Sequence, residues 1–591
     1  MARLVIDPVT RAGGHLRIEA DVSSGAVAEA WASATMFRDL ETVLRGRDAR
    51  DAWLLAERIC GTCTSVHALA SVRAVENALG IDIPTNARLI RNVLAATQLV
   101  RDHVVGFYLT QGPDWVDAKS ALKADPAATS RLAGEASAWP RSGSEYLKGV
   151  RDRLAAVIES DQPGMFANGP WGHPAYHLTP EQNLLLLAHL LEALDWQRSF
   201  MRIHALLGGK DPHPQTYLVG GMALAPPWGG PNPSVTREHP QVPEHEAPVA
   251  LSEAGIEMID GLLTEALAFV EQVFVPDVRL LATAYPEWAA LGTGAGDYLA
   301  WGDYPQKDGK DPVLFLPRGR VTDGNFNRGL EADPDRVAET VTHAWYTYSG
   351  GDEALLRPAE GETVPAWSGL PLPLDTLEGA AKYTWIKAAR YDGKPMETGP
   401  LARVLVGAAN GQSEIRLGLD KLLRETGLGV ETLPGVLGRM LARALEAQVL
   451  VRQADAWLWE LKTNLATGDV AVTDTSFWDP ASWPSEAEGR SIGEGPRGAV
   501  GHWVRIRDGM IDGYQVVDGS TWNTSPRDAM GGRGPIEAAL VGTPVADPTR
   551  PLEIQRVVHS FAPCAGCAAH LFDPRAAGPL EIRVRAGERT R

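Results

Sequence analysis

The feature that most constrains this chain is the placement of its cysteines. All four cysteines of the 591-residue sequence occur in two Cys-x-x-Cys pairs, one near each end. The first pair lies in RICGTCTSVHALAS (58–71) and the second in HSFAPCAGCAAHLFDP (559–574). Each pair is followed by a histidine, a residue type that can bind a metal or donate a hydrogen bond to a sulfur. The pattern predicts that the two ends of the chain meet and build one site.

The bulk composition narrows what that site can be. Four cysteines are too few for a disulfide framework in a chain of this length, so metal or redox chemistry is favoured. On spacing alone, a structural zinc site with four cysteine ligands stays open, as do disulfides within each pair. The formal charge of −18 and the isoelectric point near 5.3 argue against nucleic acid and anionic membranes as partners, because both require a basic surface. The N-terminal sequence is not that of a secretory signal.

The hydrophobic pattern predicts a mainly helical protein. Apolar residues recur with helical period in five long stretches, at 64–79, 86–111, 180–208, 250–285 and 433–467. Alternating apolar and polar residues around turn signals predict β-hairpins within 4–33 and 501–517. Segments 208–248, 300–335 and 350–400 are rich in Gly, Pro and Trp, and we expect long ordered loops there. The predicted fold is α+β, mainly α, with a long central helix bundle and peripheral β-hairpins near the two termini, in one domain spanning 1–591.

Many segments along the chain resemble one family. R-I-C-G-T-C-T-S-V-H and P-C-A-G-C-A-A-H are similar to the two end motifs of the large subunit of nickel-iron hydrogenases. The likeness continues in order along the chain, through DPVTR, GHLRIE, RGRDARDAW, HALASVRAVENALG, FANGPWGHPAY, HLLEALDWQR, GPLARVLVG, GPRGAVGHW, STWNTSPRD and GTPVADPTRPLEI. The membrane-bound, uptake-type group is the most similar. The resemblance favours a catalytic hydrogenase subunit over the zinc alternative.

The resemblance implies a bimetallic centre and its chemistry. In the family, four thiolates hold nickel, and two of them also bridge to an iron that carries carbon monoxide and cyanide. Carried over by position, Cys60 and Cys564 are terminal on nickel, whereas Cys63 and Cys567 are the bridging ligands. The implied reaction is heterolytic cleavage of H2, with Cys564 or Arg497 accepting the proton.

Further residues match the surroundings of that centre. Arg497, preceded by Pro496 in GPRG, matches an arginine above the open coordination position, and Asp102 matches a carboxylate beside it. Ser520 matches a residue that hydrogen-bonds a cyanide ligand, and His67 lies one helical turn after the first cysteine pair, within reach of a sulfur. Without the resemblance, we would interpret each of these as an ordinary structural residue.

The resemblance also implies a second metal and several partners. Glu41, His570 and the backbone carbonyl of Val516 match the ligands of a smaller site that holds magnesium or iron. The implied partners are H2, a small subunit with iron-sulfur clusters, and a cytochrome b or quinone-linked acceptor. The small subunit would hold the enzyme at the periplasmic or outer face of a membrane. A maturation protease would remove residues 571–591, the extension after the motif histidine.

The chain departs from the family pattern close to the predicted centre. Gly13 stands in R-A-G-G-H, where relatives have a glutamate that relays protons, and Ala562 replaces an aspartate that helps to hold Arg497. Gly106 replaces a common histidine, and VVDGST replaces the usual VVPST or VVPTT. These changes predict slow turnover, or proton transfer through water or another carboxylate such as Glu494. They also raise an alternative function, a hydrogen-sensing or catalytically impaired paralogue, which would be cytoplasmic.

Overall fold

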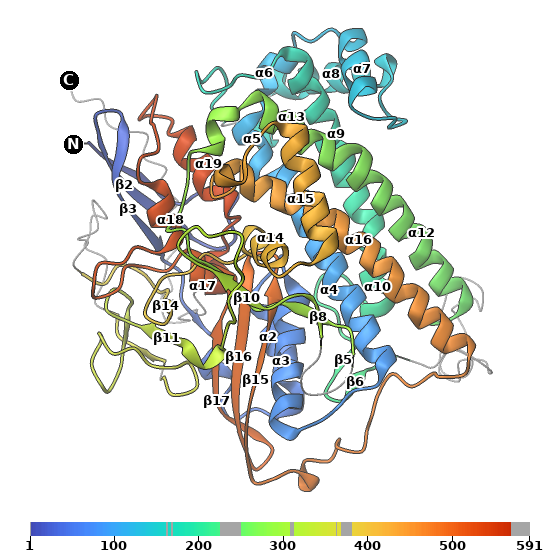
Figure 1. Ribbon diagram of the computed structural model, residues 1–591, viewed down its shortest axis with the longest axis vertical. Coiled ribbons are helices and arrows are strands. Elements are labelled where there is room, and N and C mark those ends of the chain that lie inside the picture. The colour runs from blue at the N-terminus through green and yellow to red at the C-terminus, as the bar shows by residue number, and fades with distance from the viewer. Residues whose placement is uncertain are drawn as a thin grey trace.

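A bundle of long helices forms one side of the molecule, and two small sheets lie beside it (Figure 1). The computed structural model describes residues 2–160, 164–166, 169–224, 250–307, 313–361, 363–367 and 381–568. The principal helices are α3 (Thr64–Leu79), α4 (Thr85–Val105), α9 (Pro180–Phe200), α12 (Glu253–Phe269) and α16 (Val436–Ala466). α16 packs along α4, and α12 packs on both α9 and α16. The prediction of an α+β fold with a central bundle is confirmed.

Local sequence signals set the helix ends. Thr179 caps α9 through a capping box with Gln182, as Thr-Pro at the start of this stretch leads one to expect. The stretch predicted as one helix at 86–111 is α4 continued by a π-helical segment, Gly106–Gln111. A second π-helical segment, Val270–Phe274, joins α12 to α13 (Val275–Ala284). Both segments lead into a helix with proline in its first turn, which cannot donate a backbone hydrogen bond, and the wider π turn accommodates this loss.

Each predicted hairpin belongs to a three-stranded antiparallel sheet. The first sheet pairs β1 (Ala2–Ile6), β2 (Leu16–Ser23) and β3 (Ala26–Ala34). The second pairs β15 (Glu486–Gly495), β16 (Gly498–Arg507) and β17 (Met510–Val517). Asp508 and Gly509 join β16 to β17 with φ values of 51° and 77°, the conformation that an Asp-Gly hairpin turn requires. The two hairpins are confirmed, and each sheet has one strand more than predicted.

The expectation of long ordered loops needs a correction. Within 300–335 and 350–400, the described part of the chain contains short strands of two-stranded sheets, such as β14 (Ala388–Tyr391), which pairs with β11 (Val337–Thr340) from between the two segments. Their strands are two to four residues long and pair with distant partners, so the sequence shows no periodicity from which to predict them. Residues 225–248, 308–312, 362 and 368–380 of the predicted loops lie outside the described residues.

The fold brings the two ends of the chain together. Residues 7–15, between β1 and β2, lie against the segment that joins α19 (Leu552–Ser560) to α20 (Ala565–Ala568). Gly13 N donates to Pro563 O at 3.3 Å, and Gly566 N donates to Gly13 O at 3.3 Å. Gly14 has φ of 74°, and a Cβ there would lie 2.2 Å from Gly566 N, so only glycine permits this approach.

Among the described residues, no helix is both long and apolar enough to cross a bilayer.

Candidate metal centre

Four buried thiols from the two ends of the chain converge. Cys60 lies just before α3 and Cys63 is at its N-cap, whereas Cys564 precedes α20 and Cys567 lies within it. The Sγ atoms are 3.8 Å apart between Cys60 and Cys564, 3.7 Å between Cys63 and Cys567, and 2.9 Å between Cys564 and Cys567. All four are buried and free of disulfides. This set of soft donors, drawn from both predicted motifs, fits a thiophilic metal.

The first motif is arranged to stabilise a thiolate. The backbone N–H groups of Thr62 and Cys63 donate to Cys60 Sγ at 3.4 and 3.2 Å. Burial opposes ionisation of Cys60, but hydrogen bonds from the other thiols and the charge of Arg497 hold its pKa well below the ordinary value. The thiolate is the form that binds metals, so these contacts favour metal binding.

Arg497 connects the two cysteine motifs. It lies at the tip of the β15–β16 hairpin, where Pro496 and Arg497 form the two-residue connection. Its Nη2 donates to Thr62 Oγ1 at 3.1 Å in the first motif, and its Nε donates to Ala562 O at 2.9 Å beside the second. Asp102 Oδ2 lies 3.9 Å from Arg497 Nη1, and burial raises the pKa of Asp102 to about 6. The structure therefore places Arg497 and Asp102 beside the thiols, and Pro496 precedes Arg497 at the hairpin tip.

The short helix α17 (Gly519–Asn523) supports both the arginine and the second cysteine pair. Ser520 Oγ accepts a hydrogen bond from Cys564 N at 3.2 Å. Asn523 Nδ2 donates to Arg497 O at 3.1 Å. Asp518 caps the helix by accepting from Thr521 N at 2.8 Å, and burial raises its pKa to about 6. The structure thus brings Ser520 to the site. It also adds the carboxylate of Asp518, which the sequence shows only as part of the departure VVDGST.

His67 lies on the first turn of α3, close to Cys63 and Cys567, which the resemblance predicts to be the bridging ligands. A ring nitrogen of His67 and the sulfurs of Cys63 and Cys567 lie within 4.8 Å of one another. Nδ1 is 3.1 Å from His502 Nε2, and His502 Nδ1 is 2.7 Å from the hydroxyl of Tyr514. Burial lowers the pKa of His67 to about 4, so the ring is neutral at pH 7. The sequence pattern did not single out His502 and Tyr514, which lie on β16 and β17, with His502 facing His67.

Comparison with known proteins identifies the family of this site. The family description "Nickel-dependent hydrogenase" matches residues 38–570. The chain is 43% identical to the uptake hydrogenase large subunit of Rhizobium leguminosarum bv. viciae, over 99% of this chain and 97% of that protein. It is 42% identical to the hydrogenase-1 large chain of Escherichia coli strain K12, with the same coverage. The chain belongs to the nickel-dependent hydrogenase family. It is the large subunit of such an enzyme, the catalytic subunit that cleaves H2.

Solved hydrogenase structures share this fold. A variant of the NiFeSe hydrogenase from Desulfovibrio vulgaris Hildenborough superposes with a TM-score of 0.76 and 30% identity, over 96% of this chain and 99% of that one. The H2-activated NiFeSe hydrogenase of Dm. baculatum gives a TM-score of 0.72 and 29% identity, over 96% and 100%. The resemblance to hydrogenase large subunits is therefore confirmed, and a zinc protein unrelated to hydrogen is not supported.

A buried polar cluster surrounds Glu41, the first residue predicted for a second metal. Glu41 accepts from Val516 N at 2.8 Å and also from the hydroxyl of Thr363. Lys387 Nζ lies 3.8 Å from Glu41 and 3.2 Å from Glu339, and both carboxylates raise its pKa against the effect of burial. The structure therefore brings Glu41 and Val516 together in this hydrogenase subunit. His570 lies outside the described residues.

Two of the departures from the family pattern, Gly13 and Ala562, lie close to the thiols. A Cβ at Gly13 would be 2.6 Å from Cys564 Sγ, so a side chain there would begin in contact with that sulfur. Ala562 has φ of 50°, a backbone conformation that Asp and Asn adopt more readily than Ala. A Cβ at Gly106 would meet nothing within 4 Å. The carboxylate functions expected at positions 13 and 562 are thus missing beside the predicted metal ligands.

An ionic network behind the site escaped the sequence analysis. Arg403 on α14 (Pro400–Ala409) donates to both oxygens of Glu446, at 2.5 and 2.6 Å, and to Glu494 at 2.8 Å. His103 lies 2.6 Å from Glu446. Burial raises the pKa of Glu494 to about 7 despite Arg403. The partners come from four elements that are far apart in the sequence, so their spacing does not predict the network. The only indication in the sequence is a charged residue at a position where the helical pattern predicts burial.

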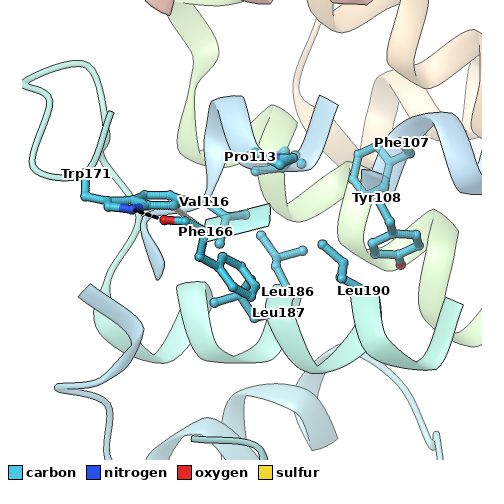
Figure 2. Close-up of a pocket in the computed structure, with 11 residues that line it drawn as sticks. Phe107, Tyr108, Pro113, Val116, Phe166, Trp171, Leu186, Leu187 and Leu190 are labelled. Carbon is cyan, nitrogen blue, oxygen red and sulfur yellow. Dashed lines mark hydrogen bonds between the residues drawn. The ribbon is translucent and has the colours of Figure 1, made fainter. Parts of the chain in front are cut away.

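A small apolar pocket of about 20 Å³ lies elsewhere in the helix bundle. Figure 2 shows Leu186 and Leu190 of α9 facing Phe107, Tyr108 and Pro113 across it. None of the sequence-predicted site residues lines this cavity. Its lining is apolar and offers little for chemistry, in contrast to the cluster of four buried thiols.

Proposed function

We propose that the four cysteines hold a nickel-iron centre whose iron carries carbon monoxide and cyanide. Cys60 and Cys564 would be terminal ligands of nickel, and Cys63 and Cys567 would bridge the two metals. The observation that carries this proposal is the convergence of four buried thiols from both ends of the chain, within 3.8 Å of their neighbours. Thiolates are soft ligands that suit nickel and low-spin iron.

The centre, when bound, supplies the site at which H2 is split into two protons and two electrons. The residues of this chain hold and move the protons. Cys564 Sγ is the proposed first acceptor because a terminal thiolate keeps a lone pair for a proton. Arg497, fixed at Thr62 and Ala562, directs positive charge toward the thiols. Despite burial, the thiols raise its pKa well above the usual value, so it stays a guanidinium and is a poorer proton acceptor than Cys564. The positive charge lowers the cost of holding several thiolates in a buried site.

Ser520 has the geometry to serve a buried anionic ligand. Its Oγ already accepts from Cys564 N, so its own O–H remains available to donate. A cyanide in a buried site requires such a donor, because an unpaired buried charge is costly. We assign Ser520, with Pro496 and Arg497, to the pocket that holds the diatomic ligands.

A second metal, magnesium or iron, would bind Glu41, the carbonyl oxygen of Val516 and His570. The buried carboxylates of Glu41 and Glu339 support a cation here, since hard cations prefer oxygen ligands. Removal of residues 571–591 by a protease would leave His570 as the C-terminus. Intact mass of the active subunit tests this step: we expect a chain that ends at His570, and a chain that ends at Arg591 would contradict it.

The names of the relatives support an enzyme that takes up hydrogen. We propose an iron-sulfur small subunit as the partner, because this chain has no cysteines left for electron-transfer clusters. Through that subunit the enzyme would be held at the periplasmic face of a membrane and pass electrons to a cytochrome b or a quinone. Nickel and iron content per purified heterodimer tests the centre. Zinc in place of both metals would refute it.

Gly13 and Ala562 support a reduced rate of proton transfer, and with it the alternative of a hydrogen-sensing paralogue. We propose that Gly13→Glu restores a carboxyl group beside Cys564 Sγ. Because a Cβ there would lie 2.6 Å from that sulfur, the backbone at position 13 must move away while the sulfur stays on the metal. General acid-base catalysis is worth about 10²- to 10⁴-fold, so the exchange of D2 with water should rise by at least about tenfold.

Gly13→Ala is the matched control, because it introduces the same steric contact without the carboxyl group. We expect exchange in Gly13→Ala to stay at or below the wild-type rate. Equal exchange in wild type and Gly13→Glu, with nickel content unchanged, would show that Gly13 does not limit proton transfer. A relay through Glu494 or water would then be the explanation.

A further inference from the structure

His67, His502 and Tyr514 form a buried hydrogen-bonded triad that ends at the cysteines. They come from α3, β16 and β17, and each is at most 1% exposed. The sheet register pairs His502 with Val516 and Tyr514 with Val504, so the side chains of His502 and Tyr514 are diagonal neighbours on one face. Because α3 packs against β16, His67 meets that face (Figure 1).

Both ring nitrogens of His502 take part in the triad. Its Nε2 lies 3.1 Å from His67 Nδ1, and its Nδ1 lies 2.7 Å from the hydroxyl oxygen of Tyr514. His67 is therefore engaged with His502 through Nδ1. This leaves Nε2 of His67 for the sulfurs of Cys63 and Cys567, which lie within 4.8 Å of a nitrogen of this ring.

The state of the sulfurs sets the direction of the hydrogen bonds in the triad. Cysteine binds a metal as a thiolate, which has no proton and can only accept a hydrogen bond. A neutral imidazole has one N–H and one lone pair, so His67 can donate to such a sulfur only if its proton is on Nε2. Nδ1 of His67 is then an acceptor, and His502 Nε2 must carry the proton that it accepts.

Tyr514 requires the same direction from the other end of the triad. A phenol with an ordinary pKa of about 10 keeps its proton at pH 7, so the Tyr514 hydroxyl has a proton to donate. His502 Nδ1, at 2.7 Å, is the acceptor. With Nδ1 as an acceptor, the ring proton of His502 is on Nε2, which faces His67. The phenol and the thiolates therefore require the same arrangement of protons.

We propose that Tyr514 and His502 are positioning residues that set the tautomer of His67, so that His67 Nε2–H donates to a bridging thiolate. This inference rests on the proposed function, in which Cys63 and Cys567 bridge nickel and iron. A hydrogen bond stabilises the buried charge of a thiolate and draws electron density from its sulfur. Without that bond, the iron receives more electron density and passes more of it to its carbon monoxide ligand, whose internal bond becomes weaker.

Neutron diffraction from crystals of the purified enzyme in heavy water tests the tautomers directly. We expect deuterium on Nε2 of His67, on Nε2 of His502 and on the hydroxyl of Tyr514, and none on Nδ1 of either histidine. Deuterium on Nδ1 of either histidine would overturn the proposal, because the direction of the hydrogen bonds would then differ. This test does not depend on the iron ligands, since any metal that the cysteines bind makes them thiolates.

Infrared spectra of variants test the effect of the triad on the centre. His502→Leu removes the donor to His67, and we expect its carbon monoxide band to move to lower wavenumber at unchanged nickel content. Tyr514→Phe removes only the hydroxyl that orients His502, and it should shift the band in the same direction by less. His502→Gln is the matched control, because its amide nitrogen can take the place of Nε2 as the donor, and its band should stay at the wild-type position.

The outcomes separate this proposal from the proposed function. A carbon monoxide band at one position in wild type, His502→Leu and Tyr514→Phe would overturn the role of the triad and leave the nickel-iron centre in place. A wild type without carbonyl or cyanide bands would instead refute the proposed centre. In that case, or if the variants do not fold, the neutron map of the wild type decides the tautomers.

Discussion

Glu446→Gln should be the most costly single substitution in the ionic network behind the metal site. Glu446 is 1% exposed and accepts three short hydrogen bonds, two from Arg403 and one from His103. Through Arg403 it is linked to Glu494 on β15, the strand that leads to Arg497. Glutamine keeps the shape of the side chain but removes its negative charge. The positive charge of Arg403 then has one fewer carboxylate to balance it.

The size of the effect follows from the pKa of Glu446. Burial would raise it, but Arg403 and His103 outweigh burial and lower it from 4.5 to about 2. At about 1.4 kcal/mol per pKa unit, this shift corresponds to about 3 kcal/mol of folding free energy. The depressed pKa means that this stability is present above pH 4.5 and is lost as the pH falls toward 2. Breaking one side of a buried ion pair costs about 3 to 5 kcal/mol, which agrees.

Denaturant unfolding of the purified enzyme at pH 7 measures the loss. The matched control is Glu271→Gln, because Glu271 also accepts from an arginine of α16, Arg452, but at the surface. Exposed pairs contribute about 0.2 to 1 kcal/mol, so the control should change little. Equal losses in the two variants would refute the reasoning that burial makes the Glu446 charge important.

Two further predictions concern Glu494 and Cys567. Burial raises the pKa of Glu494 from 4.5 to about 7, so the stability from its protonated form is complete below pH 4.5 and is lost as the pH rises to 7. Glu494→Gln should remove about 3 kcal/mol of this pH dependence, and parallel Tm profiles of wild type and variant between pH 5 and 8 would contradict it. Cys567→Ser replaces a fully buried soft donor, 3.7 Å from Cys63 Sγ, by a hard oxygen. Nickel per chain should fall below about a tenth of the wild-type content, and full nickel occupancy would show that Cys567 is not a ligand.

Features that are local in the sequence could be predicted. Helical periodicity gave α3, α4, α9 and α16, because each buries an apolar face along its whole length. The Asp508-Gly509 turn gave the β16–β17 hairpin. β15 was missed since Glu486–Gly495 contains three glycines and lacks alternation, and its pairing with β16 and close packing on α3 define it instead. Gly489, where a Cβ would lie 2.3 Å from Ala78 N, shows why glycine is needed there.

The candidate site likewise contains some residues that the sequence predicts and others that only the folded structure reveals. The cysteines could be placed because two short motifs repeat one spacing, and the family resemblance added Arg497, Ser520 and Glu41. The buried ion pairs of Arg403, Arg439 and Lys387 join residues 40 or more positions apart, so only the folded chain reveals them.

Infrared spectroscopy of the purified heterodimer under hydrogen tests the central claim most directly. Sulfurs from both ends of the chain should hold a nickel-iron centre, and the spectrum should show bands from metal-bound carbon monoxide and cyanide that shift when H2 is replaced by an oxidant. Cys567→Ser should lack these bands. A wild-type enzyme with four intact thiols, zinc in the site and no carbonyl or cyanide bands would contradict the account.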